Sequence, residues 1–281
     1  MSQSKRPFTE VRDRRLLVAA ALLLLVMLAA GVWLGLGGFD RYHPRPPGPP
    51  PLSYPATGAP ALPSGQVGLD GWKLSIPVQN EDGDATTLQP AETRSPWMTR
   101  SADGGLTFWA PTHGATTKHS DHPRTELDSL TDFAAGQERH TLAATLTIEQ
   151  EPADGRGIIL GQIHGADDIS SVPYVMLRYQ QGRVRVVVKQ VQDGDELINY
   201  PLLDNVQVGD TFEYSITDNG DGNMIFTTTM GGVSHQSVAP IPAAFRGASV
   251  RFQAGDYQQA STPGGPDDGG RVTFHALSQR P

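Results

Sequence analysis

The sequence predicts an all-β fold, a sandwich of antiparallel sheets, preceded by one N-terminal transmembrane helix and a Pro-rich linker. After residue 40, short runs rich in Val, Thr, Ile, Phe and Tyr are frequent, whereas helix-like apolar stripes are scarce. Turn formers are abundant, with 31 Gly and 23 Pro among 281 residues, and Asp-Gly and Gln-Gly pairs separate the runs. Because no crossover helices lie between the runs, we expect antiparallel pairing.

The first 66 residues predict a membrane anchor and a spacer. Residues 1–15 are polar and carry five Lys and Arg against one Glu and one Asp, which indicates a cytoplasmic segment. Residues 16–36 are uncharged, and a helix of that length, about 32 Å, crosses a bilayer core. We therefore assign residues 16–38 to a signal anchor. Prolines crowd residues 39–66, which predicts an extended linker.

These features predict a single-pass protein of the bacterial inner membrane, with its domain in the periplasm or outside the cell. The alternative is secretion after signal cleavage, although the apolar run is long for a signal peptide and Leu28-Ala29-Ala30 is a weak cleavage site. The membrane is thus an expected partner through the N-terminal helix. For the oligomeric state, a monomer is the working expectation.

Residues 67–281 form the predicted folded domain, which opens near Trp72-Lys73-Leu74. Ten strands are predicted within it: Leu106 to Ala110, Arg124 to Ser129, His140 to Glu149, Gly157 to His164, Tyr174 to Gln180, Val184 to Val191, Thr211 to Thr217, Asn223 to Met230, Ser249 to Ala254 and Arg271 to Ser278.

Composition excludes several functions. Without cysteine, the chain has neither disulfides nor thiolate metal sites. A formal net charge of -8 argues against nucleic acid as a partner. The Asp218 to Asn223 segment lacks the distant glutamate of a calcium loop, so a hairpin turn is expected. His119 and His122 have no third ligand, which places them in a solvated loop. We predict no metal and no other cofactor.

The Gln162-Ile163-His164 segment is the first candidate for chemistry. Alternate residues of a strand share a face, so Gln162 and His164 point one way and Ile163 points the other. An amide beside an imidazole can bind a ligand and move protons, although a lone strand histidine is more often a satisfied polar residue.

Arg183, Arg185 and Lys189 fall on one face of a predicted strand whose alternating valines fall on the other. A solvated outer face is the ordinary interpretation of such a pattern. From residue 68 onward, however, the chain has 15 Lys and Arg against 27 Asp and Glu. Three cations gathered on one face of so acidic a domain indicate an anionic ligand.

Two further strands carry polar faces. Arg124 and Glu126 share one face of the first. In the second, alternation gathers four side chains, and Gly255 indicates a bulge. These four are Arg251, Gln253, Tyr257 and Gln259.

At these residues the sequence resembles the alginate lyases of polysaccharide lyase family 7, over about residues 68 to 281. The resemblance rests on three motifs in the family's order, with both domain ends in support. The motifs are Arg124-Thr125-Glu126-Leu127, Gln162-Ile163-His164 and Ala254-Gly255-Asp256-Tyr257-Gln258-Gln259. It implies a β-jelly-roll with these motifs on a concave sheet.

The resemblance also implies β-elimination on an anionic polysaccharide, alginate, giving 4,5-unsaturated uronate ends. Arg124 and Gln162 would neutralise the substrate carboxylate. His164 would act as base, and Tyr257 would protonate the leaving oxygen or perform both steps. Glu126 would hold Arg124 in position. The candidate substrate-binding residues are Glu126, Lys118, Arg183, Arg185, Lys189, Arg251, Gln253 and Gln259.

Two positions depart from the family pattern, because Asp128 and Gln253 stand where the family often has an arginine and a lysine. Ile163 in the middle of its motif is associated loosely with guluronate-containing blocks. Two alternatives stay open: a membrane-tethered, non-catalytic polyuronate-binding module, and a lyase of another polyuronate such as glucuronan.

Overall fold

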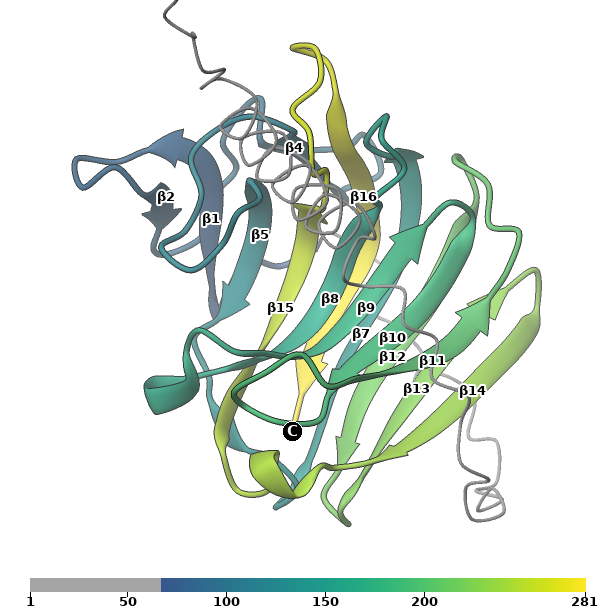
Figure 1. Ribbon diagram of the computed structural model, residues 1–281. Coiled ribbons are helices and arrows are strands. Elements are labelled where there is room, and N and C mark those ends of the chain that lie inside the picture. Colours follow the sequence, from purple (N-terminus) through teal and green to yellow (C-terminus); the bar gives the residue numbers. More distant parts are fainter. Residues whose placement is uncertain (1–66) are drawn as a thin grey trace, which may run out of the picture. The chain divides into compact units, whose positions relative to one another are not determined.

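The computed structural model describes residues 67–281, which form two antiparallel β-sheets with almost no helix (Figure 1). In the part so described, no helix is long and apolar enough to cross a membrane. The predicted anchor and linker lie outside the described residues. The strands are β1 (Trp72–Gln79), β2 (Ala85–Leu88), β3 (Met98–Arg100), β4 (Leu106–Pro111), β5 (Arg124–Ser129), β6 (Phe133–Ala134), β7 (Arg139–Gln150), β8 (Ile158–Gly165), β9 (Pro173–Gln180), β10 (Arg183–Lys189), β11 (Leu197–Leu203), β12 (Thr211–Asn219), β13 (Asn223–Met230), β14 (Val233–Pro240), β15 (Ser249–Gln258) and β16 (Gly269–Arg280).

The chain passes back and forth between the two sheets, so each sheet contains strands that are distant in sequence. One sheet has nine strands in the order β11-β10-β9-β8-β15-β5-β1-β2, with β6 paired to β15. The other has seven, in the order β14-β13-β12-β7-β16-β4-β3. Two one-turn 3-10 helices, Asp167–Ile169 and Ala243–Phe245, connect strands of these sheets. The topology places β5, β15 and β8 side by side in the middle of the nine-stranded sheet (Figure 1).

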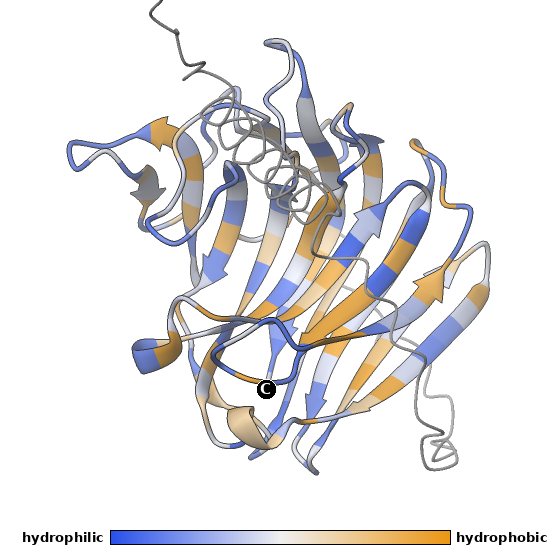
Figure 2. Ribbon diagram, viewed as in Figure 1, coloured by the Kyte–Doolittle hydropathy of each residue, from blue (hydrophilic) through white to orange (hydrophobic). Residues whose placement is uncertain are grey.

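The core lies between the sheets and is filled by every second residue of the strands. In β10 the alternating valines Val184, Val186 and Val188 are at most 1% exposed, whereas Arg185 on the opposite face is half-buried. Hydropathy accordingly alternates along many of the strands (Figure 2). Burial of such aliphatic side chains contributes about 1.5–3 kcal/mol each. Aromatic pairs add to the core, as where Tyr174 stacks on Phe245 at 4.1 Å between ring centroids.

Gly255 interrupts the regular pairing of β15 with β8, and the register shifts between Ala254 and Tyr257. A Cβ on Gly255 would lie 2.6 Å from the carbonyl oxygen of Thr125 on β5, closer than Cβ atoms approach other atoms, and its φ of +151° disfavours other residues. The bulge expected at this glycine is therefore present, and it sets the direction of Tyr257.

All ten predicted strands are present. Asp218 to Asn223 forms the expected hairpin turn between β12 and β13, with positive φ at its two glycines. Six strands were not predicted as such: β1, β2, β3, β6, β11 and β14. Three of these have only two to four residues, and β11 and β14 end their sheets, where several side chains that would mark a buried face are exposed. β1 is the segment with which the predicted domain opens.

Candidate active site

The outer face of β5, β15 and β8 gathers the residues predicted for catalysis. The pairing register places Tyr257 opposite Arg124, and Arg251 opposite His164. Gln253, on the middle strand, is opposite Gln162 on β8. We call the residues Arg124, Glu126, Gln162, His164, Gln253 and Tyr257 the central cluster. Their assembly requires three strands from distant parts of the chain.

Arg124 connects two members of the cluster. Its Nη1 donates to Glu126 Oε2 at 2.9 Å, and both side chains are nearly buried. Its guanidinium carbon lies 3.6 Å from the centroid of the Tyr257 ring, a cation–π contact. The guanidinium is thus fixed on two sides, as expected for a group that must present donors to an anion without rearranging.

Glu126 is the buried acceptor of the cluster. Burial raises the pKa of its carboxyl group, while the charge of Arg124 and the hydrogen bonds from Gln162 and Arg124 oppose that rise. Because both oxygens accept hydrogen bonds from neighbours, Glu126 is suited to orient those neighbours. The sequence predicted that Glu126 binds substrate directly, but the residue is only 1% exposed, and this burial does not favour such a contact.

Gln162 differs from expectation. Its side chain is fully buried, and its Nε2 donates to Glu126 Oε1 at 2.7 Å and to Gln253 Oε1 at 2.8 Å. An amide nitrogen has two hydrogens, and both are used within the protein. Gln162 is therefore not free to donate directly to a substrate carboxylate in this arrangement.

His164 has the geometry of a base. Its Nδ1 lies 3.1 Å from the carbonyl oxygen of Gly165, and because a carbonyl only accepts, Nδ1 carries the hydrogen and Nε2 keeps a free lone pair. Desolvation lowers the pKa of His164 to about 4, and the charges of Arg124 and Arg251 add to this effect. The imidazole is therefore neutral at neutral pH and able to accept a proton.

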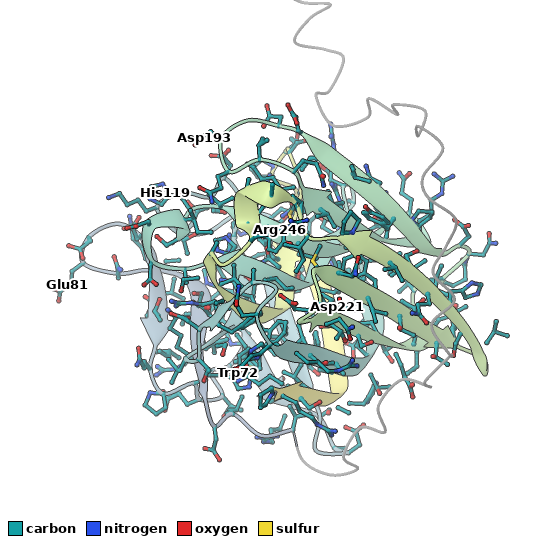
Figure 3. All side chains as sticks on the ribbon, turned by 90° about the horizontal axis from the view of Figure 1, so that it is seen from below. Trp72, Glu81, His119, Asp193, Asp221 and Arg246 are labelled. Atoms are coloured by element: carbon teal, nitrogen blue, oxygen red, sulfur yellow. The ribbon has the colours of Figure 1, made fainter. Side chains whose placement is uncertain are left out.

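The loop between β4 and β5 supplies partners that the sequence did not reveal. Ser120 Oγ is 2.8 Å from the hydroxyl oxygen of Tyr257 and donates to the carbonyl of His122. The ring of His122 lies 6.3 Å from that of Tyr257, and desolvation lowers the pKa of His122. The prediction of a wholly solvated loop is thus wrong for His122, although His119 is exposed (Figure 3). Loop residues follow no strand alternation, so only the proximity of His122 to Arg124 in sequence could have indicated this contact.

Asp128, which stands where the family often has an arginine, forms ion pairs with neighbouring cations. Asp128 Oδ2 lies 2.9 Å from Lys73 Nζ and 3.8 Å from Arg251 Nη1. Arg251 Nε also lies 2.8 Å from Asp132 Oδ1. Arg251 is therefore held between two carboxylates, which weakens its suitability as a simple replacement for a missing cation.

The remaining predicted binding residues lie around the cluster. Arg185 donates to Gln180 at 2.7 Å, and the exposed Arg183 is 3.9 Å from Asp204. Arg178, which the sequence analysis missed, is opposite Arg185 on β9 and enlarges the basic face. The others are Lys189, which is half-exposed, Lys118, which is exposed in the β4–β5 loop, and Gln259, whose amide donates to backbone carbonyls just after β15.

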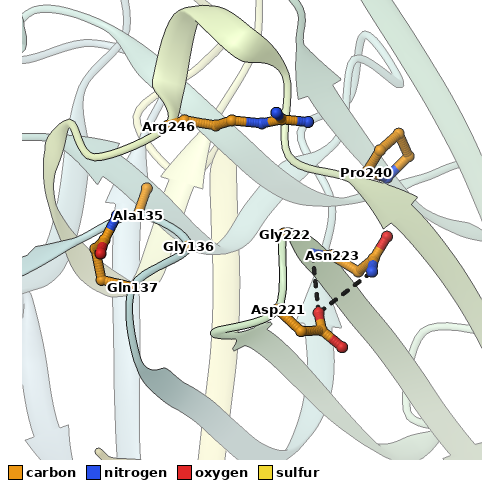
Figure 4. A pocket seen from close by; sticks show the side chains of 8 residues that line it. All are labelled: Ala135, Gly136, Gln137, Asp221, Gly222, Asn223, Pro240 and Arg246. Carbon is orange, nitrogen blue, oxygen red and sulfur yellow. Dashed lines mark hydrogen bonds between the residues drawn. The ribbon is translucent and has the colours of Figure 1, made fainter.

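A separate hollow of about 380 Å³ lies beside the turn that precedes β7 and the β12–β13 turn (Figure 4). Arg246 and Asp221 reach its edge from different segments, and Asp221 is hydrogen-bonded to Asn223. None of the residues that line it belongs to the central cluster. The hollow is therefore distinct from the candidate active site.

The fold is thus a β-sandwich of two antiparallel sheets, with arginine, histidine and tyrosine gathered on one sheet face. A family model described as alginate lyase matches residues 67–280. The chain therefore belongs to the alginate lyases of polysaccharide lyase family 7, and it is a polysaccharide lyase.

Individual relatives agree with this family. An alginate lyase of Klebsiella pneumoniae is 28% identical over 290 residues, covering 80% of this chain and 93% of the relative. The crystal structure of alginate lyase A1-II′ is 28% identical with a TM-score of 0.65, covering 78% and 98% of the two chains. That of an alginate lyase from Pseudomonas aeruginosa is 30% identical with a TM-score of 0.63, covering 76% and 99%.

Proposed function

We propose that this protein cleaves the 1,4-glycosidic bonds of alginate by β-elimination, leaving 4,5-unsaturated uronate ends. The observation that carries the proposal is the position of a neutral imidazole, His164, in a cluster with a guanidinium that is stacked on a tyrosine ring. Removal of the weakly acidic C5 proton places charge on the C6 carboxylate, so the reaction needs a fixed cation, a base and an acid. The cluster contains one of each.

Arg124 neutralises the C6 carboxylate and stabilises the charge that develops there. Its position is set by Glu126 at 2.9 Å and by the ring of Tyr257 at 3.6 Å, so little reorganisation is needed when substrate binds. His164 accepts the C5 proton through Nε2, because Nδ1 is bound to a carbonyl. Both steps use side chains that the fold already holds in place.

Tyr257 donates a proton to the leaving O4, or serves as both base and acid when proton and leaving group lie on the same side of the ring. Ser120, 2.8 Å from its hydroxyl, orients that hydroxyl. Solved forms of A1-II′ lend support: a Tyr→Phe variant is described in complex with product (GGG), and a variant with both His→Asn and Tyr→Phe in complex with substrate (GGMG). These are the two residue types to which we assign proton transfer.

For the finer specificity, we propose a weak preference for guluronate-containing blocks, on the basis of Ile163 in the Gln-Ile-His motif. The experiment that tests the function incubates the chain with defined polymannuronate, polyguluronate, alginate and glucuronan and records ultraviolet absorbance of the unsaturated product. Alginate should give the signal. Absence of the signal on every alginate-derived polymer would contradict the proposal, whereas a signal on glucuronan alone would reassign the polymer.

We also propose that residues 16–38 anchor the protein in the bacterial inner membrane, with the lyase domain in the periplasm or outside the cell. The uncharged 16–36 run and the basic residues before it support this proposal. Fractionation of expressing cells should find the full chain in the membrane and a chain starting near Ser64 in the soluble fraction. If cells that express the full chain contain it only in a shortened, soluble form, signal cleavage would be favoured instead.

A further inference from the structure

One peptide bond of β4, between Trp109 and Ala110, is held at both of its polar ends by the sheet that carries the candidate active site. The Trp109 carbonyl oxygen accepts a hydrogen bond from the Thr125 hydroxyl on β5 at 2.6 Å. The Ala110 N–H donates to Asp256 Oδ2 on β15 at 3.3 Å. β4 belongs to the seven-stranded sheet, whereas β5 and β15 belong to the nine-stranded sheet. We call these two hydrogen bonds the inter-sheet clasp.

The clasp lies directly beneath the central cluster. Asp256 is opposite Thr125 in the pairing of β15 with β5. The adjacent pair on these strands is Tyr257 opposite Arg124. Thr125 and Asp256 are fully buried inside the sandwich, so the next residues along the strands point to the outer face. Arg124 and Tyr257 are therefore each one residue away from a side chain that is bonded to the opposite sheet.

The part of the opposite sheet to which the clasp is bonded is itself fixed. The Trp109 N–H donates to the Trp97 carbonyl at 2.7 Å. On the other face, the guanidinium carbon of Arg271 lies 4.6 Å from the centroid of the Trp109 ring. Gly270 on β16 leaves the space that the Asp256 carboxyl occupies, because a Cβ at position 270 would collide with that carboxyl. The clasp thus connects the central cluster to a well-held strand.

The Asp256 carboxyl takes no part in the proton transfers proposed above. Burial raises its pKa well above the usual range and the charge of Glu126 adds to the rise, whereas the Ala110 hydrogen bond and the charge of Arg271 oppose it. Its Oδ1 is buried without a hydrogen-bond partner among the described residues. Because a buried polar group with so few partners costs free energy, its presence here indicates a role beyond packing.

We propose that Thr125 and Asp256 are positioning residues for the elimination reaction. By holding one peptide of the opposite sheet, they fix the places of Arg124 and Tyr257 on the outer face. This inference rests on the proposed function. The reaction needs cation, base and acid to reach three atoms of the substrate at once, and a displacement of about 1 Å can cost about 10²-fold in rate. The bulge in β15 interrupts the regular pairing just before Tyr257, so a further restraint is needed there.

The first experiment removes one hydroxyl while keeping the size of the side chain. Thr125→Val in the full-length chain should lower kcat on alginate roughly 10- to 100-fold and change KM no more than about threefold, because the groups that contact substrate remain but are misaligned. The matched control is Thr141→Val, which removes a buried hydroxyl 3.1 Å from that of Thr217 in the other sheet. The control should keep the wild-type kcat. An unchanged kcat for Thr125→Val, or an equal loss in the control, would overturn the proposal.

The second experiment tests the carboxyl. Asp256→Asn should keep kcat within about threefold of wild type, because an amide oxygen still accepts from Ala110 and an amide resembles a protonated carboxyl. Asp256→Ala should lose as much kcat as Thr125→Val. Asp218→Ala is the control, since Asp218 is also buried and accepts from backbone N–H groups; it should lower thermal unfolding without lowering kcat. Equal losses for Asp256→Asn and Asp256→Ala would contradict the clasp, and this comparison is replaced by Thr125→Val alone if Asp256→Ala does not fold.

The two hydrogen bonds hold one peptide, so their effects should be coupled. Thr125→Val combined with Asp256→Ala should lose little more kcat than the weaker enzyme of the two single variants. Thr125→Val combined with Thr141→Val should instead show the product of the single effects, because those sites share no partner. A multiplicative loss in the first double variant would show that the two residues act separately and would overturn the proposal.

A measurement without turnover separates this inference from the proposed function. Hydrogen exchange of the backbone amides of β5 and β15 should be several-fold faster in Thr125→Val than in wild type, whereas β12 and β13 should keep their rates. Thr141→Val should accelerate exchange in β7 and β12 instead. If the wild type does not cleave alginate, the proposed function fails, while exchange still decides whether the clasp fixes the two strands. Unchanged exchange in β5 and β15 would show that it does not.

Discussion

Two parts of one sheet face handle charge differently. In the central cluster, Arg124 and Glu126 are almost inaccessible to solvent and contact each other at 2.9 Å. At the far end of the same face, the side chain of Arg183 is 73% exposed and stands 3.9 Å from an equally exposed Asp204. Removing one partner of a buried pair leaves an uncompensated charge inside the protein, which is costly. The attraction within an exposed pair is weak because water and salt screen it. The cluster is therefore suited to chemistry, and the β10 end to weak, adjustable attraction of a polyanion.

The largest expected effect lies in the cluster. Tyr257→Phe keeps the ring on which Arg124 stacks and removes only the hydroxyl bonded to Ser120. Turnover should fall by roughly 10² to 10⁴, while alginate binding and thermal unfolding stay close to wild type. Near-normal product formation by this variant, recorded by ultraviolet absorbance, would remove Tyr257 from proton transfer.

Removing the acceptor of the buried pair should affect both stability and activity. Glu126→Ala leaves the Arg124 guanidinium buried without its partner, which costs about 3–5 kcal/mol of unfolding free energy. Chemical denaturation measures this loss, and Glu138→Ala, at an exposed turn, is the control. A change below about 1 kcal/mol for Glu126→Ala would mean that the pair is effectively solvated.

The pKa of His164 predicts a specific pH dependence. Its pKa is about 4 in the folded chain and near 6.5 when unfolded, so between these values the unfolded state binds the extra proton. His164 therefore destabilises the fold as pH falls from about 6.5 to 4 and has no effect above 6.5. His164→Gln should flatten the stability profile in that window. In the wild type, the acid limb of kcat/KM that is due to the base should lie below pH 6.5, and a limb at 6.5 or above would contradict the assignment.

The smallest effect is expected at the exposed end of the face. Changing Arg183 and Arg185 together to Ala should weaken alginate binding a few-fold at low salt, and the difference from wild type should shrink as salt is added. Arg139→Ala with Arg280→Ala, two exposed cations on the other sheet, serves as the control for net charge. Equal alginate binding by the two double variants at low salt would show that the β10 arginines lie on an ordinary solvated face and do not contact the polymer.

The sequence by itself determined the local features of the domain. Strand alternation placed Val184 in the core and Arg185 outside, and Gly255 marked the bulge, because both depend only on neighbouring residues and on backbone sterics. The three motifs also identified the candidate catalytic residues before their proximity was known. Short strands such as β6 could not be predicted, since two residues carry no periodic signal.

Only the tertiary structure decided which groups are free and which are engaged. Gln162 and Gln253 are the same residue type on the same face, yet Gln162 donates from its nitrogen to two partners, whereas Gln253 accepts through its oxygen. Likewise, Ser120 and His122 reach Tyr257 from a loop, and Asp128 pairs with Lys73 across strands. These outcomes depend on strand pairing between distant segments and on the limited number of hydrogen bonds that each buried group can make.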